Sequence, residues 1–433
     1  MSEHALLAAI AAAPDDDEPR LVFADWLQQR GDAWGEIIVL GCELARREEP
    51  ALRQRHDQLV GERFNTSDVF HTFERGFCRQ LYSNALASAA GPPYALLREA
   101  TLADAVDESL AALAGWPLLA QIEKLDLDAA RFRSGLGAHV PPIVAAAQRV
   151  RALELMRMDL SRGDLEAILA LPHVATRLER LYISSNSPLA DALHELAWPA
   201  LAELELGACD LHGSDVAALF AGGRLRGLRT LSLSYNDIAD DGAVALAAQP
   251  FTQLAKLELE GNELTPPGIA LLAGSPHLRG LRTLAIGGGF DADIDGALPA
   301  LSTGFPALET LRLESRFELP SLPALARPLH ELRLHLDTID PAVLATLLAT
   351  RAARALRWFD LVLRDDKRGD VLATVIAAAE LPELARLSFR TPISPTGVRS
   401  FARAPHLPAS CHLMLKTDAD ASPLRARYAS VTV

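Results

Sequence analysis

A six-residue pattern, apolar-x-x-apolar-x-apolar, recurs along most of the chain and constrains the fold more than any other feature. It begins at eleven positions between residues 122 and 384, and successive starts lie 28, 28, 23, 27, 26, 27, 27, 21, 27 and 28 residues apart. A weaker last copy ends at Leu413 and Leu415. Because self-similarity at a period of roughly 20–50 residues is the signature of repeat architectures, we expect a solenoid rather than about three globular domains.

Each repeat predicts one strand and one helix. In the copy at 228–233 the alternating leucines Leu231 and Leu233 point inward, and the residues between them point outward. The segment that follows has helical spacing of small and apolar residues, at Gly242, Ala243, Leu246 and Ala247. Parallel strands need a crossover connection, and one strand with one helix cannot bury its own apolar face. The repeats therefore stack, with a concave parallel sheet and convex helices.

These repeats resemble the leucine-rich repeat, and their spacing resembles its ribonuclease-inhibitor-like class. The best matches are LRTLSLSYNDIADDGAVALAAQ at 228–249 and LAKLELEGNELTPPGIALLAG at 254–274. The resemblance implies an α/β horseshoe in which an Asn after the strand binds the backbone of adjoining turns. Asn186, Asn236 and Asn262 stand at that position, and Cys209 is an accepted substitute. Later copies depart from it and are expected to be less regular, with no full helix in the short 308–328 copy; they carry Gly289, Arg316, Asp337, Arg364 and Pro392.

Residues 1–61 carry no repeat and predict a small all-α domain of four helices. Ser2 can cap a helix that runs to about Ala13, Asp16 or Asp17 can cap a second that ends at Gly31, and two more are expected at about 35–47 and 50–60. The segment resembles the bacterial repeat-companion domain in its PDDD turn, RLVFADWL helix, Gly-Asp break and CELAR end. We expect residues 62–120 to be a connecting region and irregular N-terminal cap, and residues 121–433 to be the solenoid with its C-terminal cap.

The composition excludes several classes of function. With 42 Lys and Arg against 56 Asp and Glu, the net charge is −14 and no basic cluster compensates locally, which argues against a nucleic-acid partner. The Ala-rich N-terminus lacks the basic start of a signal peptide. Apolar stretches such as 109–122 are shorter than about 18 residues and hence too short for a membrane span. The four dispersed cysteines suit free thiols, so we expect a cytoplasmic protein.

Groups that carry chemistry elsewhere have simpler explanations in this sequence. Asp25 and Trp26 could form an exposed recognition pair, but a Trp that anchors the helical core is favoured. The acidic turn at 15–18 lacks the ligand spacing of a calcium loop. Cys209 falls on a buried repeat position, and His406, Cys411 and His412 have no fixed metal-ligand spacing. Residues 287–289 are three glycines without a phosphate-loop motif. We therefore expect no cofactor, no metal and no enzymatic activity.

The outward positions of the strands are the candidate binding site. They are acidic toward the N-terminal side and basic toward the C-terminal side, with aromatic residues between. Buried aromatic and Arg anchors dominate affinity in many interfaces, while complementary charge sets the choice of partner. The candidate residues are Tyr182, Glu203, Glu205, Tyr235, Glu258, Glu260, Arg312, Arg333, Trp358, Arg386 and Arg390.

Three hypotheses follow for the function. The leading one is a non-enzymatic scaffold or regulator that binds an unidentified protein or peptide on the concave face. The second is a self-assembling structural protein, which the helical domain and the long chain motivate; the sequence leaves the oligomeric state open. The third, by analogy of fold alone, is a GTPase-activating protein that uses Arg312 or Arg333 as a charge-stabilising finger, or a ubiquitin-ligase-like protein.

Overall fold

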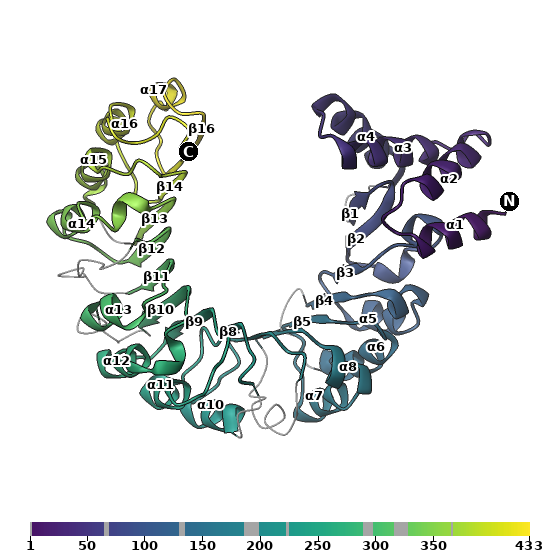
Figure 1. The fold of residues 1–433 in the computed structure, drawn as a ribbon, viewed down its shortest axis with the longest axis horizontal. Coiled ribbons are helices and arrows are strands. Elements are labelled where there is room, and N and C mark those ends of the chain that lie inside the picture. Colours follow the sequence, from purple (N-terminus) through teal and green to yellow (C-terminus); the bar gives the residue numbers. More distant parts are fainter. Residues whose placement is uncertain are drawn as a thin grey trace. The chain divides into compact units, whose positions relative to one another are not determined.

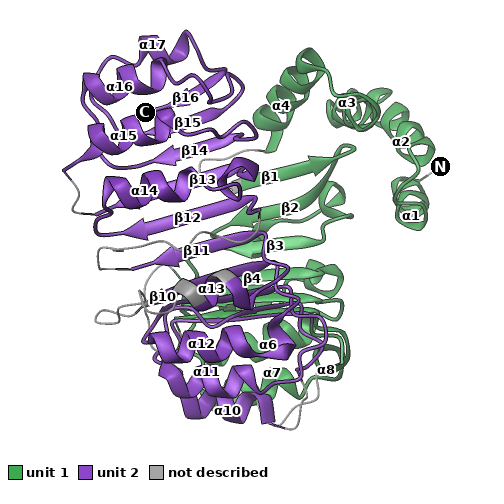
Figure 2. Ribbon diagram, turned by 60° about the vertical axis from the view of Figure 1, so that its left-hand side comes forward, with its two compact units in different colours: residues 1–192, 196–201 green, residues 193–195, 202–433 purple. Residues whose placement is uncertain are grey.

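The computed structural model describes residues 2–64, 69–129, 135–185, 199–221, 225–288, 298–315, 328–364 and 367–433. The chain forms two compact units. Unit 1 comprises residues 1–192 and 196–201, and unit 2 comprises residues 193–195 and 202–433 (Figure 2).

Unit 1 begins with the four predicted helices. They are α1 (Glu3–Ala12), α2 (Glu18–Gln28), α3 (Trp34–Arg46) and α4 (Pro50–Phe64). The Ser2 hydroxyl accepts a hydrogen bond from the Ala5 N–H at 3.4 Å, and Asp16 accepts one from the Glu18 N–H at 2.9 Å. Gly31 has a φ of 72°, the left-handed conformation that glycine adopts without steric cost at the end of a helix. The cap by Ser2 is thus confirmed; at the second helix Asp17 occupies the N-cap position without a side-chain bond, and Asp16 makes the bond.

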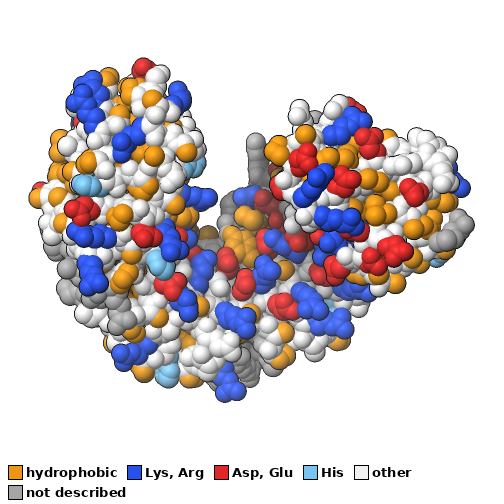
Figure 3. Space-filling model, turned by 45° about the horizontal axis from the view of Figure 1, so that its top comes forward, with side chains coloured by type: hydrophobic (Ala, Val, Ile, Leu, Met, Phe, Trp, Pro, Cys, Tyr) orange, Lys and Arg blue, Asp and Glu red, His pale blue; other side chains and the backbone are white. Residues whose placement is uncertain are grey.

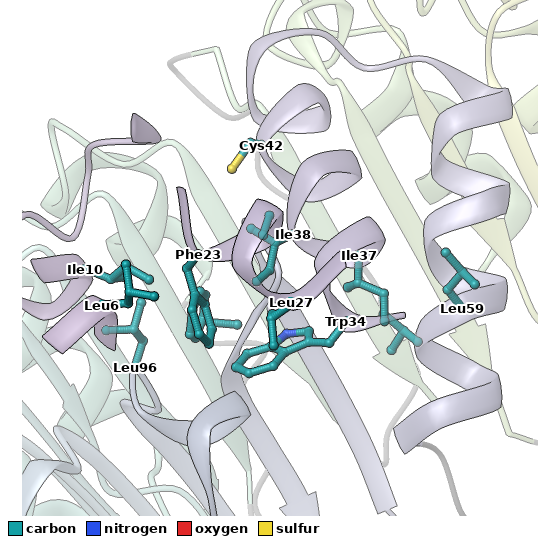
Figure 4. Packing of buried hydrophobic residues seen from close by; sticks show 13 residues of the cluster. Leu6, Ile10, Phe23, Leu27, Trp34, Ile37, Ile38, Cys42, Leu59 and Leu96 are labelled. Atoms are coloured by element: carbon teal, nitrogen blue, oxygen red, sulfur yellow. The ribbon is translucent and has the colours of Figure 1, made fainter. Parts of the chain in front are cut away.

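Trp34, rather than Trp26, anchors the core of these helices. Its ring packs edge-on against Phe23 and Phe77, with centroid distances of 5.2 Å in both cases, and Figure 4 shows it beside Leu27. The buried face of α2 consists of Arg20, Phe23, Ala24 and Leu27. This i, i+3, i+4, i+7 stripe excludes Trp26, which is half-buried, while Asp25 is exposed. The prediction of Trp26 as the anchor was therefore wrong.

The PDDD turn has a structural role. Arg20 is only 3% exposed and donates hydrogen bonds to the carbonyl oxygens of Pro14 and Asp16, at 2.6 and 2.8 Å. The Asp17 carboxylate pairs with Arg46 at 2.9 Å. Burial raises the pKa of the Cys42 thiol to about 12, and the charge of Asp17 adds to the rise. The turn is therefore held by Arg20 and Arg46, which belong to the RLVFADWL and CELAR motifs, and by Arg75, which donates to the Asp15 carbonyl at 2.7 Å.

The segment after α4 is regular, which corrects the expectation of an irregular cap. It contains an antiparallel hairpin of β1 (Val69–Glu74) and β2 (Phe77–Ser83), then β3 (Glu99–Leu102) and α5 (Asp107–Ala114), with 3-10 turns η1 (Leu86–Ser88), η2 (Pro92–Tyr94) and η3 (Pro117–Gln121). The Trp34 indole N–H donates to the Gly76 carbonyl at 2.6 Å, so the hairpin shares the core of the helices. β3 follows the repeat pattern with Ala100 at a position where other copies carry Leu.

The rest of unit 1 consists of parallel strands and short helices. β3 pairs in parallel with β2 and with β4 (Lys124–Asp128), and the ladder continues to β5 (Ala152–Met156) and β6 (Arg180–Ser184). The connections contain η4 (Leu136–His139), α6 (Val140–Ala146), α7 (Arg162–Leu169) and α8 (Pro172–Arg177).

Over its described residues, unit 2 alternates strands with helical segments, and its paired strands are parallel. Helices cover one face of the strands, and we call the other the open face (Figure 1). The strands are β7 (Glu203–Gly207), β8 (Thr230–Ser232), β9 (Lys256–Asn262), β10 (Thr283–Gly288), β11 (Thr310–Glu314), β12 (Glu331–Leu336), β13 (Trp358–Leu363), β14 (Arg386–Phe389), β15 (His412–Leu415) and β16 (Ser430–Thr432). The helical segments are α10 (Gly213–Phe220), α11 (Ala239–Ala247), α12 (Pro266–Gly274), η6 (Pro276–Leu278), α13 (Leu298–Gly304), α14 (Pro341–Leu348), η8 (Ala353–Ala355), α15 (Gly369–Ala378), α16 (Pro395–Ala402) and α17 (Ser422–Arg425).

Each of the eleven predicted hexamers overlaps a strand, from β4 to β14, and the weak last copy is β15. The inward leucines Leu231, Leu233, Leu257 and Leu259 are 0% exposed, as their register predicts. Asn236 and Asn262 are buried and bind backbone of their own and the preceding repeat. Asn186, Gly289 and Arg316 lie outside the described residues, as does most of the helix region of the 308–328 copy.

The copies after residue 328 are more regular than expected. β12, β13 and β14 are each followed by a helix of eight to ten residues, α14, α15 and α16. Backbone hydrogen bonds join these repeats beyond the strand ends, such as the one from the Arg364 N–H to the Leu336 carbonyl at 3.0 Å. The prediction that departures from Asn make these copies irregular was therefore wrong.

Candidate functional site

The parallel register of unit 2 aligns the outward residues of its repeats into rows that run across the strands. An outer row begins each strand: Glu203, Thr230, Lys256, Thr283, Thr310, Glu331, Trp358, Arg386 and His412. A central row lies two residues further on: Glu205, Ser232, Glu258, Ala285, Arg312, Arg333, Asp360, Ser388 and Met414. Ten of the eleven candidate residues belong to unit 2, and Tyr182 lies on β6 of unit 1, half-buried.

Part of the central row is buried even though no helix covers it. Ser232, Glu258, Asp360 and Ser388 are 6%, 8%, 5% and 1% exposed. Strands lie only about 4.8 Å apart, so a long side chain on one strand can cover a short one on the next. Glu258 was predicted to contact a partner, but neighbouring side chains cover it. Glu203, Glu205 and Glu260 are half-exposed.

Glu258 is the first member of a chain of ion pairs. Its carboxylate accepts from Lys256 and Arg312, both at 3.0 Å. Arg312 also approaches Glu331 at 3.7 Å, and Glu331 pairs with Arg333 at 2.6 Å. Arg312 on β11 reaches Glu258 on β9 because Ala285 on the intervening β10 is small; Ala285 pairs in register with both and is 0% exposed. The chain thus links β9 to β12.

Trp358 lies between cations from both neighbouring strands. The Arg333 guanidinium carbon is 3.8 Å from the centroid of its ring, and that of Arg386 is 5.3 Å away. Such cation–π contacts contribute roughly 0.5–2 kcal/mol, depending on how far they are shielded from water. The indole N–H of Trp358 is covered and has no hydrogen-bond acceptor. Arg386 is exposed, whereas Arg333 is half-buried.

Asp360 is held beneath this cluster as an ionised group. Burial acts to raise the pKa of its carboxyl, but hydrogen bonds from His335 and Ser388 outweigh burial, and the pKa lies below its ordinary value. The distance from the His335 Nε2 to the Asp360 Oδ2 is 3.3 Å. Arg390, which is exposed, donates to the Ser388 hydroxyl at 3.4 Å.

Tyr235 marks the opposite, acidic end of the face. It is 60% exposed and follows β8 in a left-handed conformation, with a φ of 61°. A side chain at Gly261 would collide with its ring, so the glycine allows the ring to lie there. Burial raises the pKa of the Tyr235 hydroxyl, and the charges of Glu314 and Glu260 add to the rise. Burial and the charge of Glu258 likewise raise the pKa of the Glu260 carboxyl.

Comparison with known proteins agrees with this geometry. The family described as Leucine Rich repeat matches residues 226–247, which contain β8 and α11. The fold is that of a leucine-rich-repeat protein. No curated protein matches the chain in sequence.

Three solved structures are similar to this leucine-rich-repeat chain. One belongs to the yeast complex of Rad7 and Elc1, with 16% identity, a TM-score of 0.46, and coverage of 71% of this chain and 73% of that one. Another is TLR13 in complex with ssRNA13, with 17% identity and a TM-score of 0.40. The match covers 78% of this chain and 46% of that one. A third is the internalin inlF of Listeria monocytogenes str. 4b F2365, with 15% identity and a TM-score of 0.36. The match covers 67% of this chain and 82% of that one. At these scores the assignment of fold rests on the repeats of the chain itself.

The open face of the repeats offers recognition groups of both signs. Figure 3 shows basic and acidic side chains interspersed on the C-terminal part of the chain, at the left of the view.

The four cysteines are all buried, including Cys209 at 1% exposure. Within the described ranges, His, Cys, Asp and Glu side chains form no group of three or more that could hold a metal ion. Among the helices that the structure describes, none is long and apolar enough to span a membrane.

Two functional features of these repeats were missed by sequence reasoning. His335 continues the outward series after Arg333, and its position could have been read by extending the pattern beyond the hexamer. The small residues of β10 leave room for Arg312 on β11 to reach Glu258 on β9, and they were the sequence signal for this long-range ion pair. That signal becomes readable only once adjacent repeats are aligned residue by residue.

Proposed function

We propose that this chain is a non-enzymatic scaffold or regulator that binds a protein or peptide partner on the open face of unit 2. The observation that carries the proposal is the order of charge along that face. Carboxylates accessible to solvent lie on β7 and β9, and guanidiniums accessible to solvent lie on or directly after β12 and β14. The two groups are Glu203, Glu205 and Glu260, and Arg333, Arg386 and Arg390.

The two groups are far enough apart to act independently. The nearest strands of the two groups, β9 and β12, are three strand spacings or about 14 Å apart, which exceeds the Debye length of about 8 Å at physiological ionic strength. β9 and β14 are separated by five spacings, or about 24 Å. An extended polypeptide of about eight residues spans that distance and can carry a different charge at each end. A nucleic acid, uniformly negative, would meet carboxylates at one end of the face. A protein or peptide is therefore favoured over a nucleic acid as the partner.

Aromatic anchors support the same proposal. Tyr235 is exposed at the acidic end, and Trp358 is held at the basic end by two arginines. Tyr, Trp and Arg are the residues enriched where binding energy concentrates in interfaces. Arg312 and Arg333, which a charge-stabilising finger would use, are engaged by Glu258, Glu331 and Trp358. Their engagement favours binding over catalysis.

The test is affinity capture from native lysate with identification by mass spectrometry. The wild type is compared with a variant that carries Glu203→Lys, Glu205→Lys and Glu260→Lys. Glu258 stays unchanged because its removal would leave Lys256 and Arg312 without their carboxylate. A matched control carries Asp241→Lys, Glu383→Lys and Asp418→Lys, which reverse exposed carboxylates that lie off the strands. We expect a partner that the wild type and the control retain and the open-face variant loses; equal retention by all three would contradict the proposal.

Further parts of the proposal concern the class of the repeats, the N-terminal helices and the location. We assign the repeats to the ribonuclease-inhibitor-like class because of their period and their helical crossovers. Residues 1–61 are proposed as a repeat-companion domain of the bacterial type, residues 62–120 as the cap and residues 121–433 as the solenoid. The four cysteines are buried and form no disulfide, which supports a cytoplasmic location.

A further inference from the structure

Two exposed guanidiniums beside Trp358 point to the chemistry of the partner. We propose that Arg386 and Arg390, with Trp358 as their platform, bind carboxylate side chains of an acidic segment in the partner protein. We call these three residues the Trp358 clasp. The inference rests on the proposed function of the open face and adds the identity of the groups recognised at its basic end.

The positions of the two arginines suit neighbouring acidic side chains. Arg386 begins β14 and Arg390 directly follows it, so four residues and about 13 Å of extended backbone separate them on one side of the strand. Ser388 lies midway and is short, and its 1% exposure shows that neighbouring side chains cover the space above it. Two long side chains can therefore converge over Ser388 from either end. Trp358 on β13 and Met414 on β15 border this space with apolar surface.

The charges of the two arginines remain available to a ligand. The Arg333 guanidinium forms an ion pair with the Glu331 carboxylate, at 2.6 Å. By contrast, no described carboxylate lies within ion-pair distance of Arg386 or Arg390. Among the described side chains, the Arg390 guanidinium donates to the Ser388 hydroxyl and attracts the Asp360 carboxylate without an ion-pair contact, and Arg386 lies against the Trp358 ring. Guanidiniums bind carboxylates through paired, charge-assisted hydrogen bonds, and neither arginine makes such a bond to a carboxylate in the part of the chain that the structure describes.

Asp360, the described acid beneath the clasp, is engaged by other groups of the protein. Asp360 is 5% exposed beneath the clasp, and His335 and Ser388 both hydrogen-bond its carboxylate. It cannot rise to pair with Arg386 or Arg390 without losing those contacts. A carboxylate from a partner meets no such competition.

An acidic protein segment fits better than a phosphate polymer. The clasp contains the indole ring of Trp358, and the thioether of Met414 borders it. Both surfaces suit apolar side chains next to the acids of the partner. The carboxylates of β7 and β9 and the net charge of −14 disfavour a long polyanion that extends beyond the clasp. A short acidic stretch within an otherwise mixed polypeptide avoids that repulsion.

The test is a selection of peptides from a random-sequence display library on the full chain. We expect the retained peptides to be enriched in Asp and Glu next to apolar residues. The double variant Arg386→Ala, Arg390→Ala is expected to abolish the enrichment and to weaken a synthetic peptide from the selection by about tenfold or more. Arg386→Lys with Arg390→Lys should restore part of the affinity, because charge returns without the paired geometry. Arg399→Ala, on α16 of the same repeat, removes an equal charge from the helix side and should change nothing.

The possible results distinguish the Trp358 clasp from the broader proposal that a partner binds on the open face. Absence of acidic enrichment, or enrichment that survives the double variant, would overturn the Trp358 clasp. Binding of a labelled single-stranded oligonucleotide as tight as that of the selected peptide would also overturn it, in favour of general anion binding. If lysate capture still shows a partner that needs Glu203, Glu205 and Glu260, the open face stands and only the clasp is lost. Thermal melting of each variant shows whether it is folded.

Discussion

At the scale of single residues, Asn236 shows what one buried amide does for the repeats. Its carbonyl oxygen accepts from the N–H groups of Cys209 and Leu211, at 2.9 and 3.2 Å. Its NH₂ donates to the carbonyls of Leu206 and Leu233, at 2.7 and 2.8 Å. One side chain thus satisfies backbone groups of two successive turns that no water reaches.

Replacement of Asn236 by Ala should be strongly destabilising. Several buried backbone groups would lose their partner, and each such loss costs about 1–3 kcal/mol. We expect a fall of about 2–4 kcal/mol in the free energy of unfolding, measured by urea denaturation of the full chain. The neighbouring Asp237, which is exposed, serves as the control: Asp237→Ala should cost about 0.5 kcal/mol or less. A similar small loss at Asn236 would mean that the amide is not a structural link.

Asp126 in unit 1 makes stability depend on pH. Burial raises the pKa of its carboxyl to about 6, and the charge of Glu154 adds to the rise. Below about pH 4 the group is protonated in both folded and unfolded chains. As the pH rises to about 6, the unfolded chain ionises first, so the folded state loses stability, and the loss is complete near neutral pH.

Asp126→Asn should therefore stabilise the protein at pH 7.5 but not at pH 4. The expected gain at the higher pH is on the order of 1–2 kcal/mol after allowance for solvent screening. Thermal melts at the two pH values measure it, with Glu108→Gln on α5 as the exposed control. An equal effect of Asp126→Asn at both pH values would show that burial does not raise its pKa in the fold.

At the scale of elements, the alternation of each strand separates residues that hold the solenoid together from residues that face outward. On β8 and its extension, Leu233 is 0% exposed, whereas Thr230 is half-exposed on the open face. The difference arises from the two-residue period of a strand and from the helix that covers only one side. A shift of register by one residue would exchange the two sets.

Leu233→Ala should cost about 2–5 kcal/mol in the free energy of unfolding, because it leaves a cavity between repeats. Thr230→Ala should cost about 0.5 kcal/mol or less. Chemical denaturation of both variants compares them directly. Similar costs at the two positions would place the register one residue away from the one described.

The sequence predicts these strands because the hexamer is a local pattern, and each predicted copy coincides with a strand. β3 was missed because Ala100 replaces Leu, and Trp34 was passed over because its burial depends on the hairpin that contains Gly76. The pairing of Arg312 with Glu258 joins residues 54 positions apart and depends on the small Ala285 between them. Contacts of that range follow from the register of three strands, which no single repeat encodes.

At the scale of the whole molecule, the account depends on where a partner binds. The open face of unit 2 carries exposed Tyr235 and the Trp358 clasp, while the helix side carries scattered apolar residues such as Val244 at 52% exposure. A self-assembling protein would instead bring copies of the chain together at high concentration. Light scattering that shows a monomer under those conditions would remove that alternative.

The most direct test of open-face binding is photo-crosslinking from two matched positions of one repeat. A photoreactive phenylalanine analogue replaces Tyr235 beside the open face or Val244 on α11, which are 60% and 52% exposed. Both proteins are irradiated in native lysate, and the adducts are identified by mass spectrometry. The account predicts one partner crosslinked from position 235 and absent from position 244. The same partner from position 244 alone would contradict it and place binding on the helix side.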